Sequence, residues 1–270
     1  PNITHTMNKL EDQLHCVLFI RSNRGVTLTP EGENLYARIS SAAVQIQDAE
    51  EELSASASLS HGAISISATE TALNIYLSEQ LRGFHAQYPG IRLRITNHST
   101  LQAVQAVKNG EVDFAVVTTP AETGSDLKRV ALMPFNEILV GGPSFAELAG
   151  RTLALQALTA YPLIMLENGS MSRIFYRQFF LEHNAELKPD IEAGTTDQML
   201  TLVRSDLGLA FVPEPMARGN LHRKRILQMN LQEAIPSRSV CLVYDPRRPL
   251  NTAAREFRHQ LLESAKNKQK

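Results

Sequence analysis

Residues 18–32 read Leu-Phe-Ile-Arg-Ser-Asn-Arg-Gly-Val-Thr-Leu-Thr-Pro-Glu-Gly and combine two short strands, a basic turn and the start of a helix. Apolar side chains precede the turn and alternate with threonines after it, as in a half-buried hairpin. Arg21 and Arg24 give the tip donors suited to phosphate oxygens or groove edges, and Gly25 permits the turn. These residues alone fit a solvated surface hairpin and the wing of a DNA-binding module equally well.

The preceding segment, residues 1–14, favours the DNA-binding interpretation. Its apolar residues are spaced four, three and four apart, which predicts an amphipathic helix. Short polar side chains cluster toward the N-terminal end of the other face, where a recognition helix meets base edges. Together with the hairpin tip, this face predicts DNA contacts from Pro1, Asn2, Thr4, His5, Asn8, Lys9, Arg21 and Arg24.

The order of these motifs is specific. A helix that ends in Leu10-Glu11 is followed by Leu-Phe-x-Arg at residues 18–21, and then by Arg-Gly-x-x-Leu-Thr-x-x-Gly at residues 24–32. This order resembles the LysR-type transcriptional regulators. Members of that family have two further helices before this point, so the resemblance implies that residues 1–29 are a partial winged helix-turn-helix. It also implies binding to double-stranded promoter DNA.

Composition sets wider limits. The chain has 270 residues, a formal net charge of −1 and two cysteines. Its length allows more than one domain, and no apolar run is long enough to span a bilayer. Cys16 and Cys241 fall in segments assigned to different domains, so we expect reduced thiols and a cytoplasmic protein. The near-neutral charge neither supports nor excludes DNA binding, because basic residues can be concentrated locally.

A long helix is predicted to follow the hairpin, with Thr29 as its N-cap and Pro30 as its first residue. Six apolar residues then recur at intervals of four and three, a seam too narrow to stabilise a lone helix. The seam predicts a homodimer or homotetramer held through Leu35, Ile39, Ala42, Ile46, Ala49 and Leu53. Packing against the body of the same chain is the alternative, and the resemblance favours dimerisation. Residues 54–62 are small and polar and predict a hinge.

From residue 63 the pattern changes to strands that alternate with helices, which predicts a parallel sheet. The scheme recurs from residue 163 to residue 212, so two similar lobes are expected. The resemblance implies the effector domain of LysR-type regulators, which is similar to type 2 periplasmic binding proteins. The predicted fold class is α/β, with a two-lobed periplasmic-binding-protein-like effector domain preceded by a partial winged helix-turn-helix and a long linker helix.

The predicted domains follow from these patterns. They are residues 1–29 for DNA binding, 30–61 for the dimerisation helix and hinge, and 62–270 for effector binding, with lobe 1 at about 62–136 and 240–270 and lobe 2 at about 137–239.

Four of the predicted strand-to-helix turns, two in each lobe, are rich in hydroxyl groups. Open α/β sheets bind ligands beyond the carboxyl ends of their strands, where helix N-termini point N–H groups outward. Each turn alone is most simply a set of helix caps, but four converging turns indicate a ligand site. The candidate effector-binding residues are Thr69, Glu70, Thr71, Ser99, Thr100, Ser170, Ser172, Thr195 and Thr196.

Hydroxyl groups and helix N-termini favour an anionic or zwitterionic effector, either a small carboxylate or an amino acid. Glu70 leaves two possibilities open. If it faces the cleft, it would repel an anion or pair with an amine. If it complements the dipole of its helix, it says nothing about the effector.

Catalytic, metal and cofactor sites are not expected. The glycine that a nucleophile elbow needs two residues after its serine is missing after Ser170 and Ser172. The cysteines and histidines show no metal-ligand spacing. The main alternative to an effector-responsive regulator is a two-lobed solute-binding receptor of a membrane transporter, which predicts a signal peptide and no winged helix.

Overall fold

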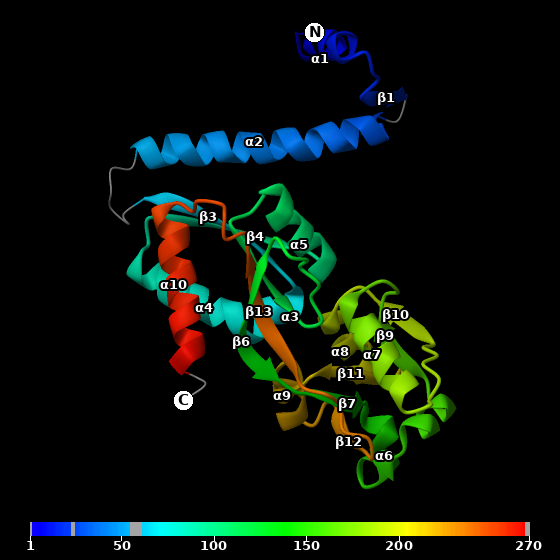
Figure 1. Ribbon diagram of the computed structural model, residues 1–270. Helices are drawn as coiled ribbons and strands as arrows, with labels where there is room; N and C mark the ends of the chain where they lie inside the picture. Colours follow the sequence, from blue (N-terminus) through cyan, green and yellow to red (C-terminus); the bar gives the residue numbers. More distant parts are fainter. Residues whose placement is uncertain (1, 23–24, 55–60, 268–270) are drawn as a thin grey trace.

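The computed structural model describes residues 2–22, 25–54 and 61–267, which form an N-terminal arm and two α/β lobes (Figure 1). Pro1, Arg24 and most of the expected hinge lie outside these ranges. The arm begins with helix α1 (Asn2–Leu14) and a hairpin of β1 (Phe19–Ser22) and β2 (Gly25–Leu28), which confirms the predicted helix and wing.

Helix α2 (Pro30–Ser54) runs along the outside of lobe 1 (Figure 1). The Thr29 hydroxyl accepts a backbone N–H of the first turn at 3.0 Å, as predicted for the N-cap. The helix touches lobe 1 where the hydroxyl of Ser41 donates to the backbone carbonyl of Asn109. Within the described ranges no helix, α2 included, is both long and apolar enough to cross a membrane.

Lobe 1 is built on a five-stranded sheet with strand order β4-β3-β5-β13-β6. Its strands are β3 (Gly62–Ala68), β4 (Ile91–Asn97), β5 (Phe114–Thr118), β6 (Lys128–Phe135) and β13 (Arg238–Tyr244). Its helices are α3 (Glu70–Ala72), which continues through the π-helical turn η1 (Leu73–Leu77) into α4 (Ser78–Gln87), and α5 (Thr100–Asn109) and α10 (Thr252–Asn267). The core on one face joins η1, α4 and α10 through Tyr76, Phe84 and Phe257, and α5 packs into a second apolar cluster.

Lobe 2 is built on a six-stranded sheet with strand order β10-β9-β11-β7-β12-β8. Its strands are β7 (Glu137–Gly141), β8 (Thr152–Leu153), β9 (Leu163–Leu166), β10 (Ile191–Ala193), β11 (Leu209–Pro213) and β12 (Leu227–Leu231). Its helical elements are η2 (Pro143–Phe145), α6 (Ala146–Ala149), η3 (Leu155–Ala160), α7 (Met171–Glu182), α8 (Thr196–Arg204) and α9 (Glu214–His222). Helix α7 contributes to one apolar cluster, and α8 and α9 contribute to another.

The expectation of a parallel sheet was incomplete, because both sheets are mixed. Strands β3, β4 and β5 pair in parallel as predicted, but β13 runs antiparallel to β5 and β6. In lobe 2, β7 runs antiparallel to β11. The antiparallel strands arise where the chain crosses between lobes, from β6 into β7 and from β12 into β13 (Figure 1).

Candidate functional site

A cleft of about 320 Å³ opens at the carboxyl ends of strands from both lobes. The structure brings all nine candidate effector-binding residues to its lining, which includes Thr69, Glu70, Thr71, Ser99, Thr100, Ser170, Ser172, Thr195 and Thr196. The four hydroxyl-rich turns, which are far apart in sequence, therefore meet in one place. Two of them belong to lobe 1 and two to lobe 2.

Four of the nine residues are helix N-caps. Side-chain oxygens of Thr69, Ser99, Ser170 and Thr195 each accept the backbone N–H three residues further on, at 3.2 or 3.3 Å. Thr100 and Thr196 are not caps, because each is the buried first residue of its helix and the preceding residue is the cap. The hydroxyl groups of these two threonines are therefore not used to cap α5 and α8.

Glu70 spans the cleft. It begins α3 in lobe 1, yet its carboxylate accepts the backbone N–H of Thr196 at 2.8 Å and of Asp197 at 3.2 Å, in the first turn of α8 in lobe 2. Burial raises the pKa of Glu70, and the two hydrogen bonds oppose this rise. Neither possibility left open by the sequence describes this arrangement fully. Glu70 does complement a helix dipole, but the helix belongs to the other lobe.

The charged side chains that line the cleft are acidic. Glu70 and Glu167 are among the lining residues, and no lysine or arginine of the described ranges lines the cleft. His98 adds an imidazole whose Nδ1 lies 3.0 Å from the hydroxyl of Ser67. Attraction of the cleft for an anion therefore comes from backbone N–H groups, helix dipoles and neutral side-chain donors such as hydroxyl groups, and not from a lysine or arginine in the described lining.

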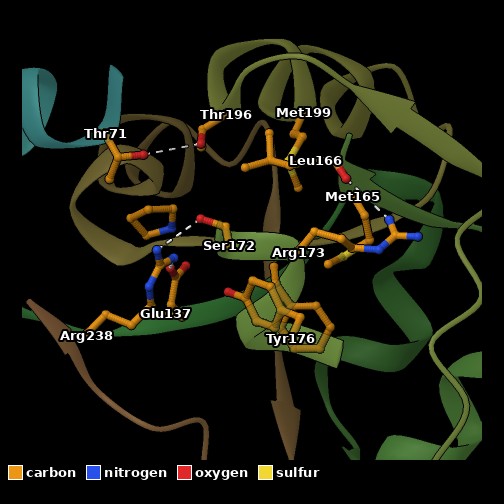
Figure 2. Close-up of a pocket in the computed structure, with 12 residues that line it drawn as sticks. Thr71, Glu137, Met165, Leu166, Ser172, Arg173, Tyr176, Thr196, Met199 and Arg238 are labelled. Atoms are coloured by element: carbon orange, nitrogen blue, oxygen red, sulfur yellow. Dashed lines mark hydrogen bonds and ion pairs between the residues drawn. The ribbon is translucent and has the colours of Figure 1, made fainter. Parts of the chain in front are cut away.

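A buried ion pair lies next to Ser172 of the cleft, at the start of β13, where the chain enters the sheet of lobe 1 (Figure 2). The guanidinium of Arg238 pairs with Glu137 at the start of β7 and donates to the hydroxyl of Ser172 at 2.9 Å. It also donates to the hydroxyl of Thr118 at 3.1 Å and to the carbonyl of Thr119 at 2.6 Å. Arg238 therefore joins both lobes and supports a residue of the cleft.

A second, much smaller cavity of about 10 Å³ adjoins this ion pair (Figure 2). Glu137 Oε2 and the hydroxyl of Tyr176 are buried there with no hydrogen-bond partner within the described residues. Burial and the nearby Glu137 carboxylate raise the pKa of Tyr176 well above its usual value.

The DNA-facing prediction concerns α1 and the hairpin. Thr4, His5, Asn8 and Lys9 are exposed on α1, and the side chain of Asn2 is not described. Arg21 is exposed and donates to the side-chain oxygen of Asn8 at 2.5 Å, so the two candidates are linked. The structure thus presents the described candidates to solvent on one arm.

Sequence reasoning missed several residues of these sites. Glu11 accepts the backbone N–H groups of Leu18 and Phe19 at 2.7 and 3.0 Å, and so ties α1 to the hairpin. Arg238 and Glu137 were also missed. The available signal was a lone charge at the start of an otherwise apolar run, and burial of such a residue requires a partner.

Comparison with known proteins gives consistent results. A family model described as "LysR substrate binding domain" matches residues 57–266, and "Bacterial regulatory helix-turn-helix protein, lysR family" matches residues 1–33. The HTH-type transcriptional regulator YofA of Bacillus velezensis is 27% identical over 256 residues, which cover 95% of this chain and 86% of YofA.

Two solved structures share the fold. CbnR, a LysR family transcriptional regulator, superposes with a TM-score of 0.75 at 18% identity over 98% of this chain and 89% of CbnR, and it has also been solved with its target DNA. The effector binding domain of QuiR in complex with shikimate superposes with a TM-score of 0.68 at 20% identity, over 77% of this chain and 99% of that domain.

Proposed function

Because the chain belongs to the LysR family of bacterial transcriptional regulators, we propose that it binds promoter DNA in the cytoplasm in response to a small effector held between its two lobes. The observation that carries the effector part is the convergence of four hydroxyl-rich turns from both lobes on one cleft. We propose the domains 1–29, 30–61 and 62–270 for DNA binding, assembly and effector binding. The match of residues 1–33 to a DNA-binding family argues against the solute-receptor alternative.

The effector class follows from the donors in the cleft. First-turn N–H groups of α5 and α7 point toward the carboxyl ends of the strands, and such groups favour a carboxylate. We propose a small carboxylate or an amino acid as effector. Shikimate, the ligand in the QuiR structure, carries one carboxylate, which is consistent with this class.

The effector proposal predicts that Thr100→Val and Thr196→Val weaken binding of the ligand found by a thermal-shift screen of small carboxylates and amino acids. Each substitution keeps the side-chain shape but leaves a polar group of the ligand unpaired, which costs about 1–3 kcal/mol. Calorimetric titration should show affinities about 5- to 150-fold lower. Neither variant loses an N-cap, so Thr100→Val should keep a melting temperature close to that of the wild type, whereas Thr196→Val also loses the hydroxyl contact with Thr71 and should be slightly less stable.

Thr123→Val is the matched control, because Thr123 is outside the cleft lining. It should bind the ligand as the wild type does. Wild-type affinity in both cleft variants would show that the ligand does not use these two hydroxyl groups.

The assembly proposal rests on the uncovered stripe of α2. Ile39 is 51% exposed and Ile46 is 62% exposed in the single chain, Ala42 is exposed and Leu35 is half-buried. Apolar side chains spaced along one helix face are stabilised when a second copy covers them. The side chains of Ala49 and Leu53 are not described.

Ile39→Asp is expected to lower the oligomeric state, since an unpaired charge would be buried between two copies of α2. Analytical ultracentrifugation of the full chain should show smaller particles, with a change from tetramer to dimer if the effector domains also associate. Gln47→Asp adds the same charge at an exposed position on the far side of the helix from the seam and should leave the oligomer unchanged. An unchanged sedimentation coefficient for Ile39→Asp at every concentration would contradict dimerisation through α2.

A further inference from the structure

The first turn of α8 differs from those of α5 and α7, which also face the cleft. In α8, the backbone N–H groups of Thr196 and Asp197 already donate to a carboxylate, that of Glu70. The corresponding groups of Thr100 and Leu101 in α5, and of Met171 and Ser172 in α7, have no acceptor within the described part of the protein. One of the anion-accepting helix ends is therefore filled by the protein itself.

The contact between Glu70 and the first turn of α8 has the geometry expected for the carboxylate of a bound ligand. Each oxygen of Glu70 accepts one N–H, and the donors are consecutive residues at a helix N-terminus. Its two sides come from different lobes, 126 residues apart in sequence. The hydroxyl groups of Thr71 and Thr196 lie 3.4 Å apart beside it, which adds a second contact between the lobes (Figure 2).

The acidic side chains of the cleft limit the charge that a ligand can carry. Besides Glu70, Glu167 lines the cleft, and among the residues that the structure describes no lysine or arginine lines it to compensate a further anion. A ligand with two carboxylates would place its second charge near these side chains, where like charges repel each other. A ligand with one carboxylate and one ammonium group would meet donors at α5 or α7 and carboxylates at Glu70 and Glu167.

We propose that Glu70 is a specificity-determining residue of the cleft, which excludes an effector anion from α8 and selects a zwitterion over a dicarboxylate. The second part of this proposal, that Glu70 selects a zwitterionic effector, rests on the proposed function. The occupation of α8 by Glu70 is independent of it and is tested first.

The first test measures hydrogen exchange of the Thr196 and Asp197 amides by mass spectrometry with residue-level fragmentation, on the full chain without effector. Glu70→Ala should accelerate exchange of both amides by roughly ten- to a hundredfold, because both lose a charged acceptor. Glu70→Gln should accelerate it less, since an amide oxygen still accepts one N–H. Glu122→Ala is the matched control, because Glu122 is exposed and outside the cleft lining, and it should leave both rates unchanged.

Acetate is the probe for the vacated position. It should slow exchange of both amides again in Glu70→Ala, whereas methylammonium chloride at the same concentration should not. In the wild type, acetate should have no effect at α8. Unchanged exchange in Glu70→Ala, or protection of wild-type α8 by acetate, would overturn the proposal even if promoter binding and effector response are intact.

The second test repeats the ligand screen with the wild type and Glu70→Gln. The wild type should bind amine-bearing carboxylates in preference to dicarboxylates of equal length, and Glu70→Gln should reduce that preference by at least about tenfold. A preference that is the same in both proteins, a wild type that selects a dicarboxylate, or a screen in which no zwitterion binds would refute the selection of a zwitterion. If the protein does not bind promoter DNA but shows these ligand preferences, the proposed function is contradicted and the role of Glu70 is not.

Discussion

Replacing Arg238 by Met is expected to destabilise the effector domain by about 3–5 kcal/mol, because it leaves the carboxylate of Glu137 buried and unpaired. The variant also loses the hydrogen bonds that Arg238 donates to Ser172, Thr118 and Thr119, which connect the two lobes. Urea unfolding followed by circular dichroism should show a large decrease in the midpoint. Effector binding should weaken as well, since Ser172 lines the cleft.

Two further variants test whether the loss of stability comes from the buried, unpaired charge of Glu137. Arg218→Met breaks an exposed ion pair with Glu214 and should cost only about 0–1 kcal/mol. Adding Glu137→Gln to Arg238→Met removes the unpaired charge and should regain part of the lost stability. If Arg238→Met and Arg218→Met unfold at the same urea concentration, the buried ion pair contributes no more to the free energy of unfolding than the exposed pair does.

Replacing Gly32 by Ala is expected to lower promoter affinity of the full-length protein by more than about tenfold. The added Cβ would lie 2.2 Å from the carbonyl oxygen of Leu18, and this carbonyl cannot move freely because it accepts the N–H of Thr29 at 3.0 Å. The first turn of α2 would have to shift away from the hairpin. Fluorescence anisotropy with labelled promoter DNA measures the loss.

Gly83→Ala provides the control for Gly32→Ala. Gly83 lies inside α4 with open space around its position, so the same substitution should stabilise the protein by about 0.5–1 kcal/mol and leave DNA affinity unchanged. Wild-type DNA affinity in Gly32→Ala would show that the junction between the hairpin and α2 tolerates displacement.

The features that could be predicted from the sequence are those encoded locally. The helix before the hairpin, the cap at Thr29 and the hydroxyl-rich turns each depend on residues a few positions apart, so periodicity and cap chemistry reveal them. The family motif around Gly32 was visible, and the structure adds its cause, the close approach of the Leu18 carbonyl.

The features that could not be predicted depend on pairs distant in sequence. Glu70 begins one helix, and only the folded chain shows that its carboxylate caps another helix in the opposite lobe. Arg238 and Glu137 are 101 residues apart, and no local period relates them. The antiparallel strands were missed for the same reason, since β13 joins the sheet of lobe 1 only after the chain has passed through lobe 2.

The chain passes from lobe 1 into lobe 2 after β6 and returns with β13, and this path also sets the order in which the two sheets form during synthesis. All strands of the lobe 2 sheet come from residues 137–231, so this lobe is contiguous and can complete its sheet as soon as that segment has left the ribosome. Lobe 1 cannot, because β13 lies between β5 and β6 and is translated last of its strands. Until it arrives, β6 has no neighbouring strand. A nascent chain that stops before residue 238 therefore carries a finished lobe 2 inserted in an open lobe 1, whose unpaired strand edges make it prone to aggregation.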